Sequence, residues 1–263
     1  VMVTNEDLYD LTKEVTRRIQ ALASEQSEAG AARHRAEFAR QLREARPDLF
    51  DRLPAPRRQP AAETLAACFI AVIGEIPAIV EAMLSAIDRR TTEPAVRCAL
   101  AGALAYLVHP RDLLPDDLPG GFGFVDDCMI LRATVSEFID FLPTGFTSVD
   151  KERRLLELLA VCVPPERLPE FQAEVEGIWL TFHLLLWEGE DRAHETAERI
   201  LADPLGTDLP QPERESIPLP PGPRLSMSPG EERLELDEGE IVVRFAGGGA
   251  ITMTPEGRIT AWE

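Results

Sequence analysis

The spacing of apolar residues, which changes its period once along the chain, restricts the fold more than any other feature of this sequence. Through residues 5–202 apolar side chains recur every three or four positions, as on one face of an amphipathic helix, and no strand pattern interrupts them. The pattern predicts helices at 5–25, 29–46, 62–89, 93–108, 125–142, 150–162, 166–188 and 190–202. We therefore expect residues 1–203 to form an all-α bundle.

Prolines and glycines interrupt this helical pattern. The segment Asp51–Pro60 carries three prolines and predicts a connection between helices. Gly74 and Pro77 predict a kink inside the helix at 62–89. Residues 204–230 carry eight prolines, which predicts an extended, stiff linker.

After this linker the period of the apolar pattern falls to two. Residues 231–263 alternate apolar and polar side chains between glycine-containing turns, which predicts three or four short antiparallel strands. The expected fold class is therefore mainly α: a multi-helix bundle, a Pro-rich linker at 204–230 and a small antiparallel β module at the C-terminus.

The small size of this β module has a consequence for its packing. A sheet of about 30 residues buries too little apolar area to be stable alone. Its apolar face must dock on the helices, on a copy of itself or on another protein. We expect it to bind a protein partner or to self-associate through Ile241, Val243, Phe245, Ile251, Met253 and Ile259.

The charge of the chain limits its partners. The formal net charge is −19, and a surface of this kind repels the phosphates of nucleic acids and of anionic membranes. We therefore expect no nucleic-acid partner. One helix concentrates arginines, at positions 33, 35, 40, 43 and 46. Glu37 and Glu44 lie among them, so we favour a solvated face over a site for an acidic partner.

The cysteines and the first residues of the sequence suggest a location. Cys68, Cys98, Cys128 and Cys162 are widely spaced in apolar helical patterns, which predicts reduced core thiols in a cytoplasmic protein. The first residues show no basic segment followed by an apolar run, so we expect no signal peptide.

One segment is apolar enough to raise the question of a membrane. Leu65–Leu84 is about the length of a membrane-spanning helix, but Glu75 and Pro77 lie at its centre. We expect a buried core helix and keep peripheral membrane association as an alternative. An exposed Phe122 could contribute to such an association, whereas we expect Phe124 to be a core residue.

The stretch Tyr106–Asp127 carries the most specific motif. Its spacing resembles that of the YkvA-like family, domain of unknown function 1232, through Tyr106, Pro110, Asp112, Leu113, Pro115, Asp116, Pro119, Gly123, Asp126 and Asp127. The resemblance covers roughly residues 65–142. This chain differs from the family pattern at Arg111 and at Gly120-Gly121. The family implies a small α-helical domain, sometimes membrane-associated, with no established activity.

The aspartates of this stretch allow two interpretations. Asp112, Asp116, Asp117, Asp126 and Asp127 offer the oxygen ligands that Mg²⁺ or Ca²⁺ prefers, with His109 nearby as a further ligand or base. Alternatively, these carboxylates stabilise turns and the N-terminus of the next helix. The sequence shows neither the EF-hand spacing nor a Gly-rich phosphate loop.

The function that follows from these patterns is an interaction role. We expect a non-catalytic interaction or assembly protein that needs no cofactor, with a helical domain and a docking β module. The alternatives are a metal-dependent enzyme or metal-binding protein that uses the Asp-rich loop, and a peripheral membrane protein.

Overall fold

The computed structural model of the chain describes residues 12–20, 30–89, 91–108, 113–115, 117–142, 148–173, 232–237, 240–245 and 248–262. The helical elements are a helix at 12–20, α2 (Ala31–Ala45), α3 (Pro47–Asp51), α4 (Ala55–Ile73), α5 (Ile76–Asp88), α6 (Pro94–Val108), η1 (Pro119–Phe124), α7 (Val125–Phe138), η2 (Ile139–Phe141) and α8 (Val149–Ala160). The strands are β1 (Arg233–Asp237), β2 (Glu240–Arg244), β3 (Ala250–Met253) and β4 (Ile259–Trp262). The predicted fold class, mainly α with a small antiparallel C-terminal sheet, is confirmed.

The helices lie close to the predicted ranges, with one correction. The prediction that Asp51–Pro60 is a connection is wrong, because α4 begins at Ala55 and includes Pro56 and Pro60. Pro56 lies in the first turn, where a proline removes only an N–H that has no helical partner. Pro60 lies inside α4, where it removes one backbone donor from the helix. The predicted helix at 190–202 and linker at 204–230 lie outside the described residues, as do parts of the helices at 5–25 and 166–188.

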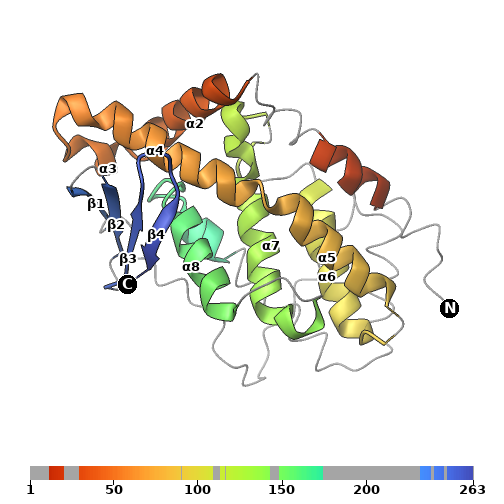
Figure 1. Cartoon of the computed structure of the whole chain (residues 1–263). Coiled ribbons are helices and arrows are strands. Elements are labelled where there is room, and N and C mark those ends of the chain that lie inside the picture. Colours follow the sequence, from red (N-terminus) through yellow and green to blue (C-terminus); the bar gives the residue numbers. More distant parts are fainter. Residues whose placement is uncertain are drawn as a thin grey trace.

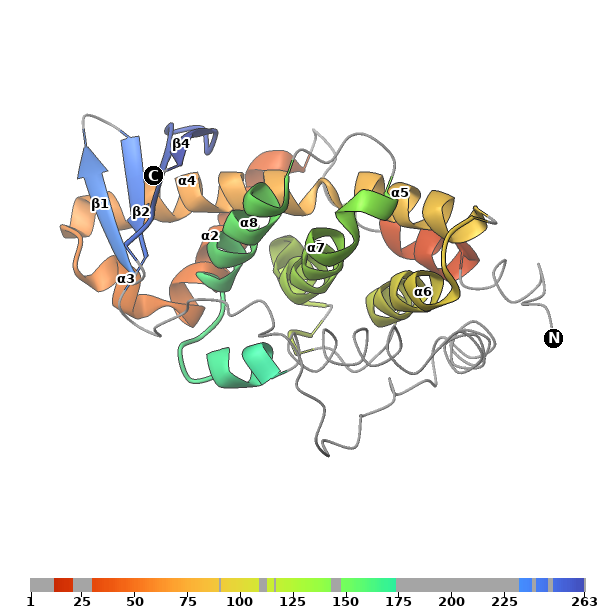
Figure 2. The ribbon, with the colours of Figure 1, turned by 90° about the horizontal axis from the view of Figure 1, so that it is seen from below.

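α4 and α5 form one interrupted rod across the molecule (Figure 1). α4 ends at Ile73, and Gly74 and Glu75 separate it from α5, which confirms the predicted kink. Figure 2 shows α8, α7 and α6 one after another along this rod, with the strands at its α4 end. The rod therefore connects the sheet at one end of the molecule to α6 at the other.

The rod is also the segment whose apolar character suggested a membrane. Ala55–Asp88 is long and apolar enough to cross a membrane by length and composition. Half of its most apolar part is buried inside the protein. Glu75 before α5 and Glu81 and Asp88 within it are exposed. This distribution is typical of a core helix with one polar face.

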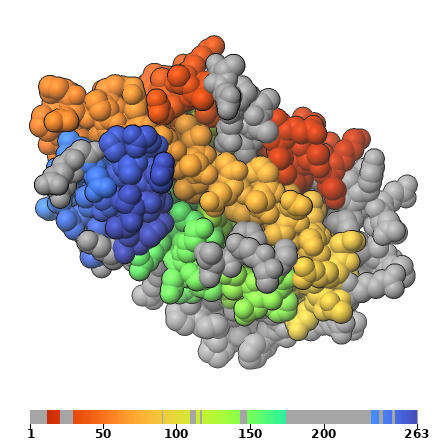
Figure 3. Space-filling model, in the orientation of Figure 1, coloured from red at the N-terminus to blue at the C-terminus, as the bar shows by residue number. Residues whose placement is uncertain are grey.

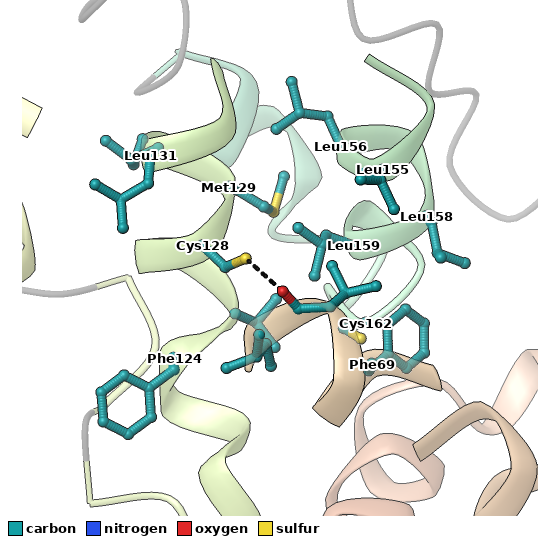
Figure 4. Packing of buried hydrophobic residues seen from close by; sticks show 14 of the residues in the cluster. Phe69, Phe124, Cys128, Met129, Leu131, Leu155, Leu156, Leu158, Leu159 and Cys162 are labelled. Carbon is teal, nitrogen blue, oxygen red and sulfur yellow. Dashed lines mark hydrogen bonds between the residues drawn. The ribbon is translucent and has the colours of Figure 1, made fainter. Parts of the chain in front are cut away.

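The core of the bundle lies between the rod and the helices that cross it. α6 buries residues on all sides, including Ala95, Leu100 and Leu104, as expected for a helix in the middle of a bundle. Near the centre, Figure 4 shows side chains of α4, α7 and α8 packed around Met129 and Leu159. Both residues have no exposed surface.

All four cysteines are buried and free, which confirms that they are core thiols. Burial raises the pKa of Cys68 to about 12 and the pKa of Cys128 to about 11. Such thiols stay protonated near neutral pH and are poor nucleophiles.

A buried arginine of α7 stabilises the break in the rod. Arg132 Nη2 donates to the Val72 carbonyl at 3.0 Å, near the end of α4, and to Glu75 in the break at 2.6 Å. Its Nη1 donates to Glu152 of α8 at 2.6 Å. Burial alone would lower the pKa of Arg132, but neighbouring negative groups outweigh it and the pKa is raised. One guanidinium thus connects α4, α5 and α8 to α7.

The sheet is antiparallel with the strand order β1-β2-β3-β4. Two rows of apolar residues run across its inner face: Leu234, Val243, Ile251 and Trp262, then Leu236, Ile241, Met253 and Ile259. The register shifts between Thr252 and Met253, where Thr260 is the additional residue of a bulge. An unbroken alternation from Ile259 would place Ala261 on the apolar face, but the bulge places Trp262 there.

The inner face of the sheet docks on the helices of the same chain. Leu234, Ile241, Val243, Ile251 and Met253 are buried in one hydrophobic cluster with the helical core. Ile259, Phe245 and Trp262 are partly buried against it. Of the three docking surfaces that the sequence left open, the structure therefore uses the helical bundle.

The turn between β3 and β4 makes the closest approach to α4. The Thr64 hydroxyl donates to the Pro255 carbonyl at 2.9 Å. A Cβ on Gly257, whose φ is +83°, would lie 2.5 Å from the backbone nitrogen of Cys68. Only glycine allows this turn to contact the helix backbone.

A second buried arginine connects the start of the sheet to three helical elements. Arg46, which follows α2, donates to Glu232 at 2.9 Å, to Asp48 of α3 at 2.9 and 3.0 Å and to the Val161 carbonyl after α8 at 3.0 Å. Burial alone would lower the pKa of Arg46, but Asp48 and Glu232 outweigh it and the pKa is raised. The same ion pair holds the pKa of Asp48 below its usual value, although burial opposes this.

The turns at Gly248 and Gly257 allow a matched test of whether the sheet docks on α4. Gly257→Ala should lower the free energy of unfolding by about 3 kcal/mol or more, from the cost of a positive φ plus the overlap with Cys68. Gly248→Ala should cost only about 1–2 kcal/mol, because its φ is +94° but no atom lies within 4 Å of the new Cβ. Urea denaturation of both variants measures the difference, and equal losses would contradict docking of the turn on α4.

The buried ion pair of Arg132 gives a second test. Arg132→Met leaves the Glu152 carboxylate buried without this partner and should cost about 3–5 kcal/mol of the free energy of unfolding. The double variant Arg132→Met/Glu152→Leu should recover most of this loss, because no unpaired buried charge remains. A double variant as unstable as the single one, measured by urea denaturation, would show that packing rather than charge pairing is responsible.

Candidate functional site

The acidic loop between α6 and α7 is the candidate site. The structure describes Leu113, Leu114, Pro115 and residues 117–124 of this loop. His109, Pro110, Asp112 and Asp116 lie outside the described residues, so their predicted roles stay predictions. Asp117 is exposed in a turn, and η1 then leads directly into α7.

The glycines at which the sequence departs from the family pattern allow the loop to contact α2. Gly120 and Gly121 both have positive φ, at 78° and 74°. A Cβ on Gly120 would lie 2.4 Å from the backbone nitrogen of Phe38 and 2.9 Å from the carbonyl oxygen of His34. The close contact with α2 therefore requires glycine at this position.

The two phenylalanines beside Gly123 are core residues. Phe124 is buried, as predicted. Phe122 is only 2% exposed, and its ring meets that of Phe38 edge to face with the centroids 5.1 Å apart. The alternative that Phe122 forms an exposed apolar tip for a membrane is therefore wrong, because α2 covers it.

Asp126 connects the first turn of α7 to the loop. Its Oδ2 accepts the backbone N–H of Leu114 at 2.9 Å and lies 3.4 Å from the Tyr106 hydroxyl, which donates to it. Its Oδ1 accepts the backbone N–H of Asp127 at 3.1 Å. The side chain has no exposed surface, and burial raises its pKa to about 6 although the backbone N–H groups oppose this.

Asp127 faces the N-terminal helix at residues 12–20. It is 1% exposed, and its Oδ2 lies 3.4 Å from Nη2 of Arg18. The Arg18 guanidinium also lies over the Phe124 ring, 4.3 Å from its centroid. This geometry combines an ion pair with a cation–π contact. Asp127 therefore pairs with a cation that the chain itself supplies.

A further arginine contacts the other side of the loop. Arg167, which follows α8, donates through Nη1 to the Leu113 carbonyl. Leu113 and Leu114 thus bind both a guanidinium and a carboxylate through their backbone. Leu114 is buried in the core cluster, so side chain and backbone together fix the loop.

The structure brings only part of the predicted metal site together. Asp126 and Asp127 are adjacent and buried, whereas Asp117 is exposed. Among the residues that the structure describes, no group of three His, Cys, Asp or Glu side chains could hold a metal ion. The two described buried carboxylates bind backbone N–H groups and Arg18, which fits their alternative role in stabilising the loop and the helix N-terminus. Binding of Mg²⁺ or Ca²⁺ remains a prediction that depends on Asp112 and Asp116.

Sequence reasoning did not assign the arginines that hold this region together. Arg18 and Arg167 lie far from the motif in sequence, and charge alone gives no signal for their contacts. Arg132 could have been noticed, because it interrupts an otherwise apolar surface of α7. Arg46 was grouped with a solvated face, and this is wrong because it is fully buried. Arg40 does follow that prediction, since it is exposed and pairs with Glu37 and Glu44.

Comparison with known proteins identifies the class to which this segment belongs. Residues 96–132 match the model of a family described as a protein of unknown function, DUF1232. The match extends from α6 through the loop into α7 and so assigns this segment to the DUF1232, or YkvA-like, family, as the motif predicted. No curated protein and no solved structure matches the chain.

The burial of Asp126 predicts a dependence of stability on pH. Its pKa is raised from 3.8 to about 6, so the folded protein binds this proton more tightly than the unfolded chain does. The contribution of protonated Asp126 to the free energy of unfolding is therefore largest below about pH 4. It is lost as the pH rises through about 6, a change of about 3 kcal/mol.

Asp126→Asn cannot bind this proton, so the two proteins should respond differently to pH. The free energy of unfolding of the wild type, relative to that of the variant, should fall by about 2–3 kcal/mol between pH 4 and pH 7. Urea denaturation at several pH values measures this difference, in which carboxylates common to both proteins cancel. A difference that stays constant with pH would contradict the raised pKa.

Proposed function

We propose that this chain is a non-catalytic interaction or assembly protein that presents the outward face of its C-terminal sheet to a protein partner. The observation that carries the proposal is the arrangement of the sheet in rows. Most residues of its apolar rows are buried or partly buried against the helices, whereas Leu236 is 40% exposed. The row between them faces away from the helices, with Glu235, Val242, Thr252 and Ala261 in register across the four strands. Glu235 and Ala261 at the two edge strands are exposed, and Val242 between them is 8% exposed.

The attachment of the sheet supports this role. Arg46 binds Glu232 at the start of β1, the Gly257 turn contacts α4, and the Arg154 guanidinium of α8 lies 6.0 Å from the Trp262 ring centroid. The sheet is thus held at its beginning and near its end. A surface fixed in this way loses little conformational entropy on binding, which favours recognition.

The outward face has the chemistry of a protein-binding surface with few apolar anchors. Arg244 pairs with Glu235 at 2.7 Å, and both side chains remain about half exposed. Thr260 and Ala261 are exposed on β4, at the other edge of the sheet. In Figure 3 these C-terminal strands, in blue, form one end of the visible surface beside the orange atoms of α4.

The family segment has a supporting role in this proposal. The carboxylate of Asp126 binds the backbone of Leu114, and Asp127 pairs with Arg18. These contacts position α6, α7 and the N-terminal helix relative to one another. The DUF1232 segment would then stabilise the body that carries the sheet, rather than bind a substrate.

Two alanine positions allow a matched test in cells. Ala261→Arg adds a long charged side chain to the outward face, whereas Ala78→Arg adds the same side chain to the exposed face of α5. Both alanines are exposed, so both variants should keep their stability within about 0.5 kcal/mol. Chemical cross-linking followed by mass spectrometry should show partners that Ala78→Arg retains and that Ala261→Arg loses about tenfold or more. Identical sets of cross-linked proteins for the two variants would contradict the proposal.

A further inference from the structure

The surface that receives the sheet is a binding site for a defined ligand, residues 232–262. Arg46 contacts Glu232 at the start of the sheet, and Thr64 and the backbone near Cys68 contact the turn between β3 and β4. The apolar rows of the sheet fill the space between these points. The helices therefore recognise a specific charge, a specific turn and an apolar face at the same time.

The sheet depends on this surface for its own stability. Four strands of four or five residues cannot form a core by themselves. Ile241, Val243, Ile251 and Met253 are at most 3% exposed only because helical side chains cover them. Wherever residues 232–262 fold, they must therefore lie on such a helical surface.

The chain connection does not restrict the sheet to its own helices. The predicted linker at 204–230 is rich in proline, and 27 residues of extended chain span about 80 Å. A domain of about 200 residues is roughly 40 Å across. The connection is thus long enough to reach the helices of a neighbouring molecule.

We propose that this docking surface also binds residues 232–262 of a second copy, so that two chains exchange their C-terminal sheets in a symmetric dimer. This inference rests on the proposed interaction function and names a partner for the inner face. Exchange keeps every docking contact, including the ion pair of Arg46 with Glu232. The monomer and the exchanged dimer therefore have the same docking contacts. In the monomer the linker keeps the sheet at a high effective concentration near its own helices, so the dimer is favoured only when the protein concentration is high.

The buried ion pair allows a direct test with full-length chains. One variant carries Arg46→Glu and another carries Glu232→Arg, so each has like charges at the docking point within one chain. In a mixture, the sheet of each chain meets the opposite charge on the helices of the other. Light scattering of the mixture should give twice the 29.1 kDa mass of one chain, with both chains present in the dimer by native mass spectrometry.

Two controls make each result decisive. A chain with both substitutions restores opposite charges at positions 46 and 232 but leaves the new carboxylate at position 46 beside Asp48 and the Val161 carbonyl. It should therefore regain part of the melting temperature that the single variants lose, and it sets the level that the mixture can reach. In addition, mixed dimers of isotopically labelled and unlabelled wild type should form after incubation at high concentration. If the chain with both substitutions folds, a mixture of single variants that regains neither a folded near-ultraviolet circular dichroism signal nor the doubled mass would overturn the proposal. Wild type that stays monomeric at every concentration would overturn it too.

Ala261→Arg separates this inference from the proposed function. The substitution changes the outward face and leaves Arg46, Glu232 and the apolar rows unchanged. Mixed dimers that persist with Ala261→Arg support exchange through the inner face. Mixed dimers that disappear with this variant contradict exchange and show instead that the outward face joins the two copies.

Discussion

The ion pair network of Arg132 is the interaction on which the arrangement of the helices depends. The rod is interrupted at Gly74 and Glu75, and a bundle needs the polar groups near such a break satisfied. Arg132 donates to the Val72 carbonyl before the break, which also accepts the Glu75 N–H, to the Glu75 carboxylate in the break and to Glu152 of α8. Arg132 thus links the break in the rod to α7 and α8 through charge, and apolar contacts pack α6 and α7 against the rod.

A second guanidinium has the corresponding role at the other end of the rod. Arg46 contacts α3, the turn after α8 and the first residue of the sheet module. Both arginines lie in a core whose apolar contacts are not directional. Because buried charges tolerate few geometries, they specify how the layers align, while the apolar side chains supply most of the stabilisation.

The local sequence pattern was sufficient to predict the helices and strands of this fold, but it was insufficient to predict how they contact one another. The helical period, the kink at Gly74 and the strands after residue 231 all follow from spacing and turn residues, because these depend on neighbours in sequence. For Asp126 and Asp127 the sequence predicted the type of contact, at a helix N-terminus, but not the residues that they contact. Arg18 and Glu232 pair with residues more than a hundred positions away, and no local signal indicates such pairs. The bulge at Thr260 likewise changed which side of β4 faces the helices.

The position of Asp126 affects how genetic results on proteins with this segment should be understood. Its carboxylate binds the loop backbone inside the core. A substitution that removes these hydrogen bonds, such as Asp126→Ala, is expected to lower the amount of folded protein in a cell whether or not the loop has any chemistry of its own. A loss of function in such a variant would then reflect a lower amount of folded protein, as expected when marginally stable chains are degraded. Exposed Asp117, which lies in the same loop, can be changed without this confusion and is the more informative position for genetics.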